Sequence, residues 1–126
     1  MRTAVICALV LLSGLTAVHA ADLTGTWTLE FQRDGGGALY RAECSFKQEG
    51  DRLAGSCLSG YESIVPVRGA VNGQTVTFRF ITGIESDVAT AFSGQLDAQE
   101  TSVKGTWRFA DQQGNAGEGT FTAQKR

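Results

Sequence analysis

Leu23-Thr24-Gly25-Thr26-Trp27 decides the fold, because its pattern returns downstream: an apolar residue, a spacer, a glycine, a small hydroxyl residue and a large side chain. The further copies are Leu53-Ala54-Gly55-Ser56-Cys57, Val103-Lys104-Gly105-Thr106-Trp107 and, in weaker form, Gly117-Glu118-Gly119-Thr120-Phe121. In each copy every second residue is apolar or glycine, which is the period of a β-strand with one buried face. The repeat therefore predicts an all-β architecture and says nothing about chemistry.

Working outward from these copies, the alternation predicts eight strands. We expect them over residues 23–32, 39–48, 52–58, 64–71, 74–82, 87–96, 102–110 and 117–124. Short strands joined in series predict an antiparallel meander, and closing it into a barrel removes two exposed edges and covers the apolar face. Glycines at the inward positions 25, 55, 69, 94 and 105 favour closure, because a strongly coiled sheet needs residues without Cβ. A two-sheet β-sandwich is the structural alternative.

The two cysteines of the β-rich region provide an internal check on one hairpin. If Gly50-Asp51 forms a two-residue turn, Glu49 faces Arg52, and counting outward places Cys44 directly opposite Cys57. This position is a non-hydrogen-bonded pair, in which side chains come closest. The register therefore predicts a Cys44–Cys57 disulfide.

Two further turns set the registers of later strands. A two-residue turn at Asn72-Gly73 predicts that β pairing sets Val71 opposite Gln74, Gly69 opposite Val76 and Val67 opposite Phe78. A turn over 98–101 predicts Leu96 opposite Val103 and Gly94 opposite Gly105. Both registers bring apolar residues or glycines together on one face.

Residues 1–20 read as a signal peptide. A short basic head, Met1-Arg2-Thr3, precedes an apolar run over 4–15 that is too short to span a bilayer, and Val18-His19-Ala20 offers the small residues of a cleavage site. We expect cleavage near Ala20, one domain over 21–126, and a secreted or periplasmic protein. No later apolar stretch is long enough to predict a membrane span.

Composition narrows the function classes. Removing Arg2 from eleven basic residues leaves ten against thirteen acidic ones, a net charge of −3, which argues against nucleic acid as a partner. Cleavage would also remove Cys7 and the single histidine, His19. Without histidine or a free thiol, neither a nucleophile triad nor a histidine-rich metal site can be built, so we expect no enzyme, no cofactor and no metal. Glu85 and Asp87 lack a second ligand group and are expected to be solvated.

The longer connections point to a binding end. They run over 33–38, 59–63, 83–86 and 111–116, all at the end opposite the tight turns and the termini. The candidate ligand-binding residues at this mouth are Tyr40, Tyr61, Arg33, Arg41 and Glu62, with Trp27 and Trp107 beneath. In the competing interpretation both tryptophans fill the barrel with the phenylalanines, which would leave only a shallow mouth.

Taken together, these features resemble the calycin superfamily, which includes lipocalins, fatty-acid-binding proteins and avidins. The resemblance rests on the Gly-x-Trp of Gly25 and Trp27, the eight-strand meander and a basic residue that ends the last strand. It implies that a terminal base packs across Trp27 and closes the barrel; Lys125 has inward parity and Arg126 is the alternative. The family uses an arginine here, so Lys125 is a departure. The polar and tryptophan constellation that avidins use for biotin cannot be located, so biotin binding is not expected.

A second resemblance covers one strand. Residues 21–29, Ala-Asp-Leu-Thr-Gly-Thr-Trp-Thr-Leu, are similar to the opening of the small periplasmic metalloprotease inhibitors of bacteria. Those inhibitors insert a free N-terminal segment into the protease, whereas here only Ala21 and Asp22 would precede the first strand. The expected function is therefore non-covalent capture of a small, partly apolar molecule at the mouth. The alternative is inhibition of, or docking to, another exported protein through the N-terminal segment and loops.

Overall fold

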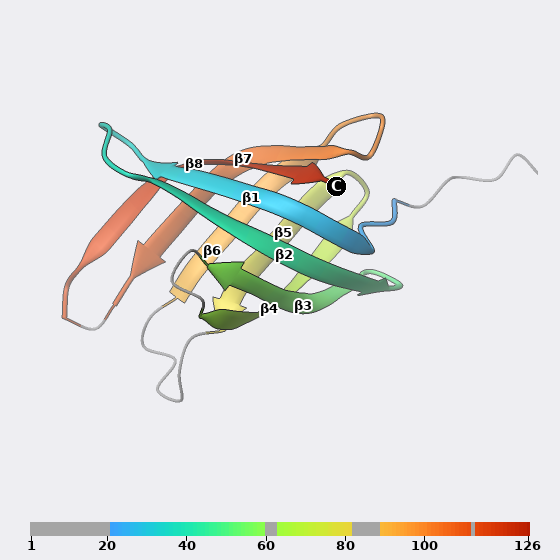
Figure 1. The fold of residues 1–126 in the computed structure, drawn as a ribbon, viewed down its shortest axis with the longest axis horizontal. Helices are drawn as coiled ribbons and strands as arrows, with labels where there is room; N and C mark the ends of the chain where they lie inside the picture. The colour runs from blue at the N-terminus through green and yellow to red at the C-terminus, as the bar shows by residue number, and fades with distance from the viewer. Residues whose placement is uncertain (1–20, 60–62, 82–88, 112) are drawn as a thin grey trace, which may run out of the picture.

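The computed structural model describes residues 21–59, 63–81, 89–111 and 113–126 as a closed antiparallel barrel. The strands follow one another around the barrel in chain order, and β1 pairs with both β2 and β8 (Figure 1). They are β1 Gly25–Arg33, β2 Leu39–Glu49, β3 Arg52–Ser59, β4 Ile64–Asn72, β5 Thr75–Ile81, β6 Ala89–Leu96, β7 Ser102–Ala110 and β8 Ala116–Lys125. The predicted all-β meander barrel is confirmed, and the β-sandwich alternative is wrong.

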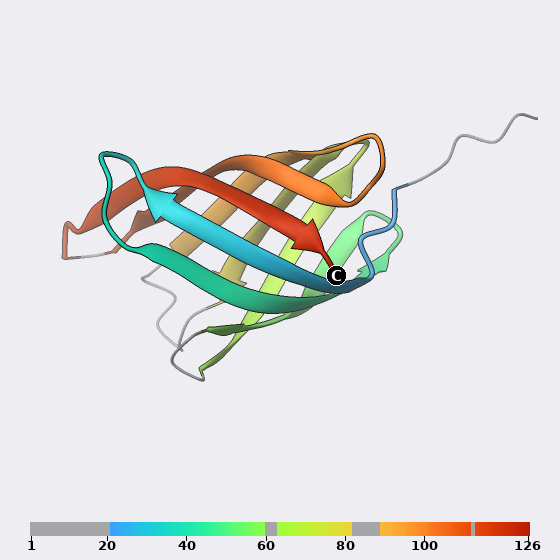
Figure 2. The ribbon, with the colours of Figure 1, turned by 45° about the horizontal axis from the view of Figure 1, so that its top comes forward.

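The two ends of the barrel differ. The turns β2–β3, β4–β5 and β6–β7 gather at the end that holds the C-terminus and the start of β1, while the β1–β2 and β7–β8 connections lie at the other end (Figures 1 and 2). We call this second end the mouth. Nowhere in the described part of the chain is there a helix long and apolar enough to cross a membrane.

The β2–β3 hairpin has the predicted register. Glu49 pairs with Arg52 and Cys44 pairs with Cys57. The two cysteines form a disulfide with Cα atoms 4.0 Å apart, and both are almost fully buried. The predicted disulfide is therefore confirmed, and it joins two neighbouring strands inside the barrel wall. The β6–β7 register, with Leu96 opposite Val103 and Gly94 opposite Gly105, is confirmed too.

The predicted register of β4 with β5 is wrong by two residues. The observed pairs are Val71 with Val76, Gly69 with Phe78 and Val67 with Phe80. Gly73, with a φ of 63°, takes the first central position of the turn, and Gln74 takes the second. A glycine with positive φ followed by a residue with negative φ is typical of a type II′ turn. In this turn Asn72 is not a central residue. Because the side-chain period of a strand is two, this slip leaves every apolar residue on its predicted face.

Aromatic and aliphatic side chains fill the barrel interior. The rings of Phe78 and Phe92 stack with centroids 4.6 Å apart, and Phe121 packs edge-on against both. The backbones of β6 and β7 approach each other so closely that a Cβ added to Gly105 would overlap the carbonyl group of Ser93. The described core consists of Leu23, Trp27, Leu29, Ala42, Cys44, Phe46, Leu53, Cys57, Val67, Val71, Val76, Phe78, Phe92, Leu96, Val103, Trp107, Phe121 and Ala123.

Candidate functional site

Two adjoining cavities open at the mouth. The larger has a volume of about 670 Å³ and lies against β1, β7, β8 and the β1–β2 connection. The smaller, about 380 Å³, lies against β2, β3 and β4. Both are lined by Phe31, Ala38, Tyr40 and Phe80. The two cavities therefore share an aromatic partition, and their volumes lie in the range of small-molecule sites.

Phe31 is the centre of that partition. It lies two residues before the end of β1, and its ring stacks on Tyr40 of β2 with centroids 5.2 Å apart. The rings of Phe80, Phe92 and Trp107 lie in edge-to-face contact with Phe31, with centroids 6.3, 5.4 and 5.4 Å from its centroid. Phe92 belongs to the filled core. Phe31 therefore separates the two cavities and, together with Tyr40 and Phe80, also forms the aromatic floor on which a ligand in either cavity would rest.

Trp107 forms the wall of the larger cavity. It is 6% exposed, and its indole Nε1 donates a hydrogen bond of 3.1 Å to the backbone carbonyl of Gln32 on β1. Gly119 of β8 is the strand partner of Trp107 and lies between it and β1. Because Gly119 has no side chain, the indole can reach across β8, and its orientation is fixed by the hydrogen bond. A rigid, partly accessible ring of this kind suits a flat or apolar ligand.

Polar groups surround this aromatic wall. The Arg33 guanidinium donates a hydrogen bond to the carbonyl of Ala116, and it packs so closely on Gly117 that a Cβ there would lie 2.9 Å from Nη2. Arg33 thus joins the end of β1 to the start of β8. Both Arg33 and the carboxylate of Asp111 line the larger cavity, so this cavity offers one cation and one anion to a polar ligand group.

Asp111 holds the β7–β8 turn in shape. Its carboxylate accepts hydrogen bonds from the Asn115 amide side chain at 2.9 Å and from the backbone N–H groups of Asn115 and Gln113 at 2.8 and 3.0 Å. These bonds favour the ionised form and lower the pKa of Asp111 below its usual 3.8, with the Asn115 side chain as the largest cause. The carboxylate is therefore ionised at neutral pH.

The residues expected at the mouth do not all line the same cavity. Tyr40, Arg33 and Trp107 line the larger cavity. Arg41 lines the smaller one, and its guanidinium Nε donates a 2.8 Å hydrogen bond to the carboxylate of Glu30 across β1 and β2. The remaining predictions at this end, Tyr61 and Glu62 together with Glu85 and Asp87, lie outside the described residues.

Trp27 lies at the other end of the barrel and lines neither mouth cavity. It is fully buried against Phe46, and its Nε1 donates a 2.9 Å hydrogen bond to the carbonyl of Leu23. The Lys125 ammonium lies 6.0 Å from the centre of its ring, a distance at which a cation is attracted to the face of an indole. Of the two terminal bases, Arg126 instead forms an ion pair with Glu43.

Several residues that line the larger cavity were not among the ligand-binding residues expected from the sequence. Phe31, Phe80 and Phe109 were expected only as core residues, and Asn115 was not considered. Strand parity could have found Phe31, because it is the inward aromatic residue of β1 nearest the mouth. Nothing in the sequence distinguishes Asn115 from other polar loop residues.

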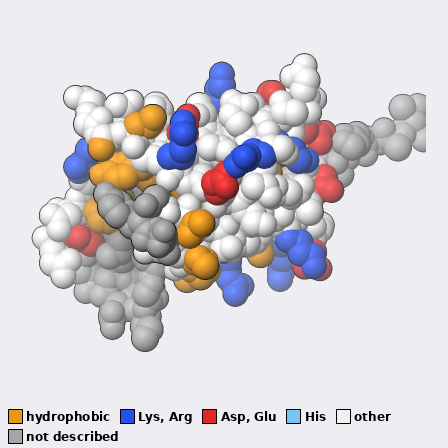
Figure 3. All heavy atoms as spheres, viewed as in Figure 1, with side chains coloured by type: hydrophobic (Ala, Val, Ile, Leu, Met, Phe, Trp, Pro, Cys, Tyr) orange, Lys and Arg blue, Asp and Glu red, His pale blue; other side chains and the backbone are white. Residues whose placement is uncertain are grey.

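The outside of the mouth end carries exposed apolar side chains. Leu58 of β3 and Ile64 of β4 are cross-strand partners that are 46% and 71% exposed, and Leu39 of β2 is 58% exposed. Figure 3 shows hydrophobic side chains gathered toward this end of the molecule. We call Leu39, Leu58 and Ile64 the outer apolar rim.

The closed eight-strand meander, with its tight turns and the C-terminus at one end and its mouth at the other, is a small β-barrel with the architecture that the resemblance to the calycins implies. Among solved structures it is similar to rhizavidin, determined in complex with biotin, with a TM-score of 0.52 and 19% sequence identity over 79% of this chain and 99% of that chain. No protein-family model matches the sequence, and the search of curated protein sequences found no match. Within the described residues, no group of three or more His, Cys, Asp or Glu side chains is placed to hold a metal ion.

Proposed function

We propose that this protein is an exported, non-enzymatic binding protein that holds a small, partly apolar molecule at the mouth of its barrel. The observation that carries the proposal is the pair of mouth cavities, about 670 and 380 Å³, that share the aromatic floor of Phe31, Tyr40 and Phe80. Filled core lies beneath this floor, so the ligand sits in a shallow site and not in a deep lipid cavity. Its apolar part packs on the rings, and its polar part meets Arg33, Asp111 or Asn115.

Two further observations support the proposal. Rhizavidin, with which this chain shares its fold, was determined in complex with biotin, so a barrel of this type can hold a small molecule. Export agrees with the Cys44–Cys57 disulfide, because disulfides form and persist in oxidising compartments, the periplasm among them. The proposal therefore includes cleavage near Ala20 and a location outside the cytoplasm.

The two tryptophans allow a sharp test, because they lie at opposite ends of the barrel. In a Trp27→Phe variant the only remaining tryptophan is Trp107, which lines the larger cavity. We expect its emission to be quenched or shifted by members of a panel of small aromatic and aliphatic carboxylic acids and their amides. The matched control is Trp107→Phe, whose remaining Trp27 is fully buried at the far end and should not respond.

The proposal fails if Trp107 emission is unchanged across the panel while the variant is folded. It also fails if both variants respond alike, because the ligand would then act away from the mouth. A Tyr40→Ala substitution should weaken binding of any ligand that quenches Trp107, since Tyr40 lines both cavities.

The second candidate function is docking to another exported protein, and the outer apolar rim favours it. Leu58 and Ile64, a cross-strand pair with exposures of 46% and 71%, form an apolar surface that a partner would cover in this function. Residues 21–24 are not free to enter a protease, because Gln48 bonds the backbone of Ala21 and Leu23 at 2.8 and 2.9 Å. Docking would therefore use the rim and loops.

Inhibition assays against a panel of secreted metalloproteases test the form of this second function in which the docked partner is a protease. If it is correct, Ile64→Ser abolishes inhibition and leaves the Trp107 response to small ligands unchanged. If no protease is inhibited by a large molar excess of the wild-type protein, the inhibitor function is rejected.

A further inference from the structure

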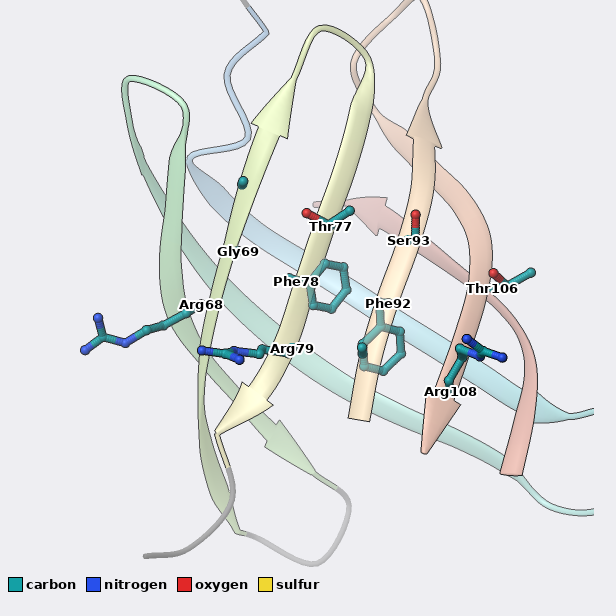
Figure 4. A pocket seen from close by; sticks show the side chains of 11 residues that line it. Arg68, Gly69, Thr77, Phe78, Arg79, Phe92, Ser93, Thr106 and Arg108 are labelled. Atoms are coloured by element: carbon teal, nitrogen blue, oxygen red, sulfur yellow. The ribbon is translucent and has the colours of Figure 1, made fainter. Parts of the chain in front are cut away.

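A separate cavity lies on the outside of the barrel wall, over β4, β5, β6 and β7. It has a volume of about 490 Å³. Three arginines stand around it: Arg68 on β4, Arg79 on β5 and Arg108 on β7 (Figure 4). No acidic side chain lines it. We call this surface the arginine face.

Two of these arginines are placed against each other. Arg68 and Arg79 are direct cross-strand partners, and like charges in that position destabilise a sheet. Figure 4 shows the Arg79 side chain extending toward β4, while the Arg68 side chain extends from β4 away from β5. The fold therefore places two positive charges on adjacent strands, and an anion between them would neutralise both.

The three arginines form no ion pair with any side chain in the described part of the chain. Among the described residues, ion pairs join Arg41 to Glu30 and Arg126 to Glu43, and none involves the arginine face. Arg108 is the register partner of Glu118 on β8, yet the two form no ion pair. The whole chain has a net charge of −2, so this concentration of unpaired cations does not reflect a generally basic protein.

The surface between the arginines is lined by small side chains, several of which carry hydroxyl groups. Ala91 separates Arg79 from Arg108 in the same cross-strand row. The neighbouring row consists of Ala70, Thr77, Ser93 and Thr106. Small side chains leave room for a ligand, and three hydroxyl groups can donate hydrogen bonds to it. Because neighbouring strands lie about 4.8 Å apart, the backbone positions of Arg79 and Arg108 are about 10 Å apart, and those of Arg68 and Arg108 are about 14 Å apart.

We propose that the arginine face is a second binding site, for a small molecule that carries phosphate or sulfate groups. One oxyanion lies between Arg68 and Arg79, where two guanidinium groups can each donate paired hydrogen bonds. A second oxyanion on the same molecule meets Arg108, and the body of the ligand rests on Ala91 and the hydroxyl row. This site is distinct from the mouth, because none of the residues that line it lines either mouth cavity.

Calorimetric titration at low ionic strength tests the site, with inositol hexakisphosphate as the probe that spans it and inorganic phosphate as the probe that does not. Wild-type protein should bind the hexakisphosphate more tightly than phosphate, and added salt should weaken both. An Arg79→Gln substitution should reduce the affinity for the hexakisphosphate about tenfold. Its melting temperature should be equal or higher, because one of two adjacent like charges is gone.

The matched control is Arg126→Gln, which removes the same charge from the exposed surface beside Glu43 of β2, outside the arginine face and both mouth cavities. It should change the affinity less than twofold, as expected for a distant exposed charge. Equal losses in the two variants would overturn the proposal, because binding would then follow net charge alone. Failure of the wild-type protein to bind the hexakisphosphate would overturn it too, as would a preference for an oligoglutamate peptide over this probe.

The mouth can be tested separately in the same variants. Arg79→Gln should leave the response of Trp107 to mouth ligands unchanged. Failure at the arginine face and failure at the mouth are therefore distinguishable.

Discussion

Replacing Phe31 with alanine should both destabilise the barrel and join the two mouth cavities. Phe31 contacts the rings of Tyr40, Phe80, Phe92 and Trp107. Removing a fully buried phenylalanine costs about 3–5 kcal/mol. Phe31 is only partly buried, so we expect the lower end, about 3 kcal/mol, which for a domain of this size is a fall in melting temperature of roughly 10–20 °C.

Urea denaturation followed by tryptophan emission measures this change. Leu39→Ala is the matched control, because Leu39 lies beside Tyr40 but is 58% exposed, and its loss should cost less than about 0.5 kcal/mol. In the folded Phe31→Ala protein we expect binding of larger ligands than the wild-type protein accepts. A loss below about 1 kcal/mol, or a loss equal to that of Leu39→Ala, would refute the role of Phe31 as the floor of the mouth.

Three further predictions concern the barrel itself. Reducing the disulfide should lower the free energy of unfolding by at most about 3 kcal/mol, because its loop is short and lies within one hairpin; urea denaturation with and without reductant measures it. Gly105→Ala should destabilise by about 2 kcal/mol or more, seen as a lower urea midpoint, because the new Cβ overlaps the backbone of Ser93. Asp97 accepts hydrogen bonds from the backbone of Thr101 and Ser102, which lower its pKa, with Thr101 as the largest cause. The ionised carboxylate contributes its full stabilisation above the unfolded-state pKa near 3.8, and this contribution is lost as pH falls through the lower pKa of the folded state. Denaturation measured between pH 7 and pH 2 should therefore show a steeper loss of unfolding free energy for the wild-type protein than for Asp97→Asn.

The hairpin turns show how far the sequence determines this fold. Gly50-Asp51 gave the right register because the facing cysteines provide an independent check on the count. Asn72-Gly73 has no such check, and the glycine can take either central position of a two-residue turn. The two placements differ by a slip of two residues, which preserves both faces, so the apolar pattern cannot choose between them.

The candidate site shows a different limit. Tyr40, Arg33 and Trp107 were recognisable from their type and their place near the longer connections. Whether an inward ring such as Phe31 belongs to the core or to a cavity floor depends on how far side chains from the opposite wall fill the barrel. Strand parity gives the direction of a side chain but not that filling. The same limit applies to Trp27, which lies in the core at the end opposite the mouth.

The arginine face was not recognisable from sequence either, because Arg68, Arg79 and Arg108 are far apart along the chain. Outward arginines on strands are ordinary on their own. Only the registers of β4 with β5, of β5 with β6 and of β6 with β7 together bring these three around one surface.

The central claim is that the mouth, and not the filled interior, receives the ligand. Nuclear magnetic resonance with ¹³C-labelled aromatic residues, titrated with a ligand that quenches Trp107, tests it most directly. We predict shifts in the signals of Phe31, Tyr40, Phe80 and Trp107, with Trp27 and Phe46 unmoved. Shifts centred on Trp27 and Phe46, or no aromatic shifts at saturating ligand, would contradict the account.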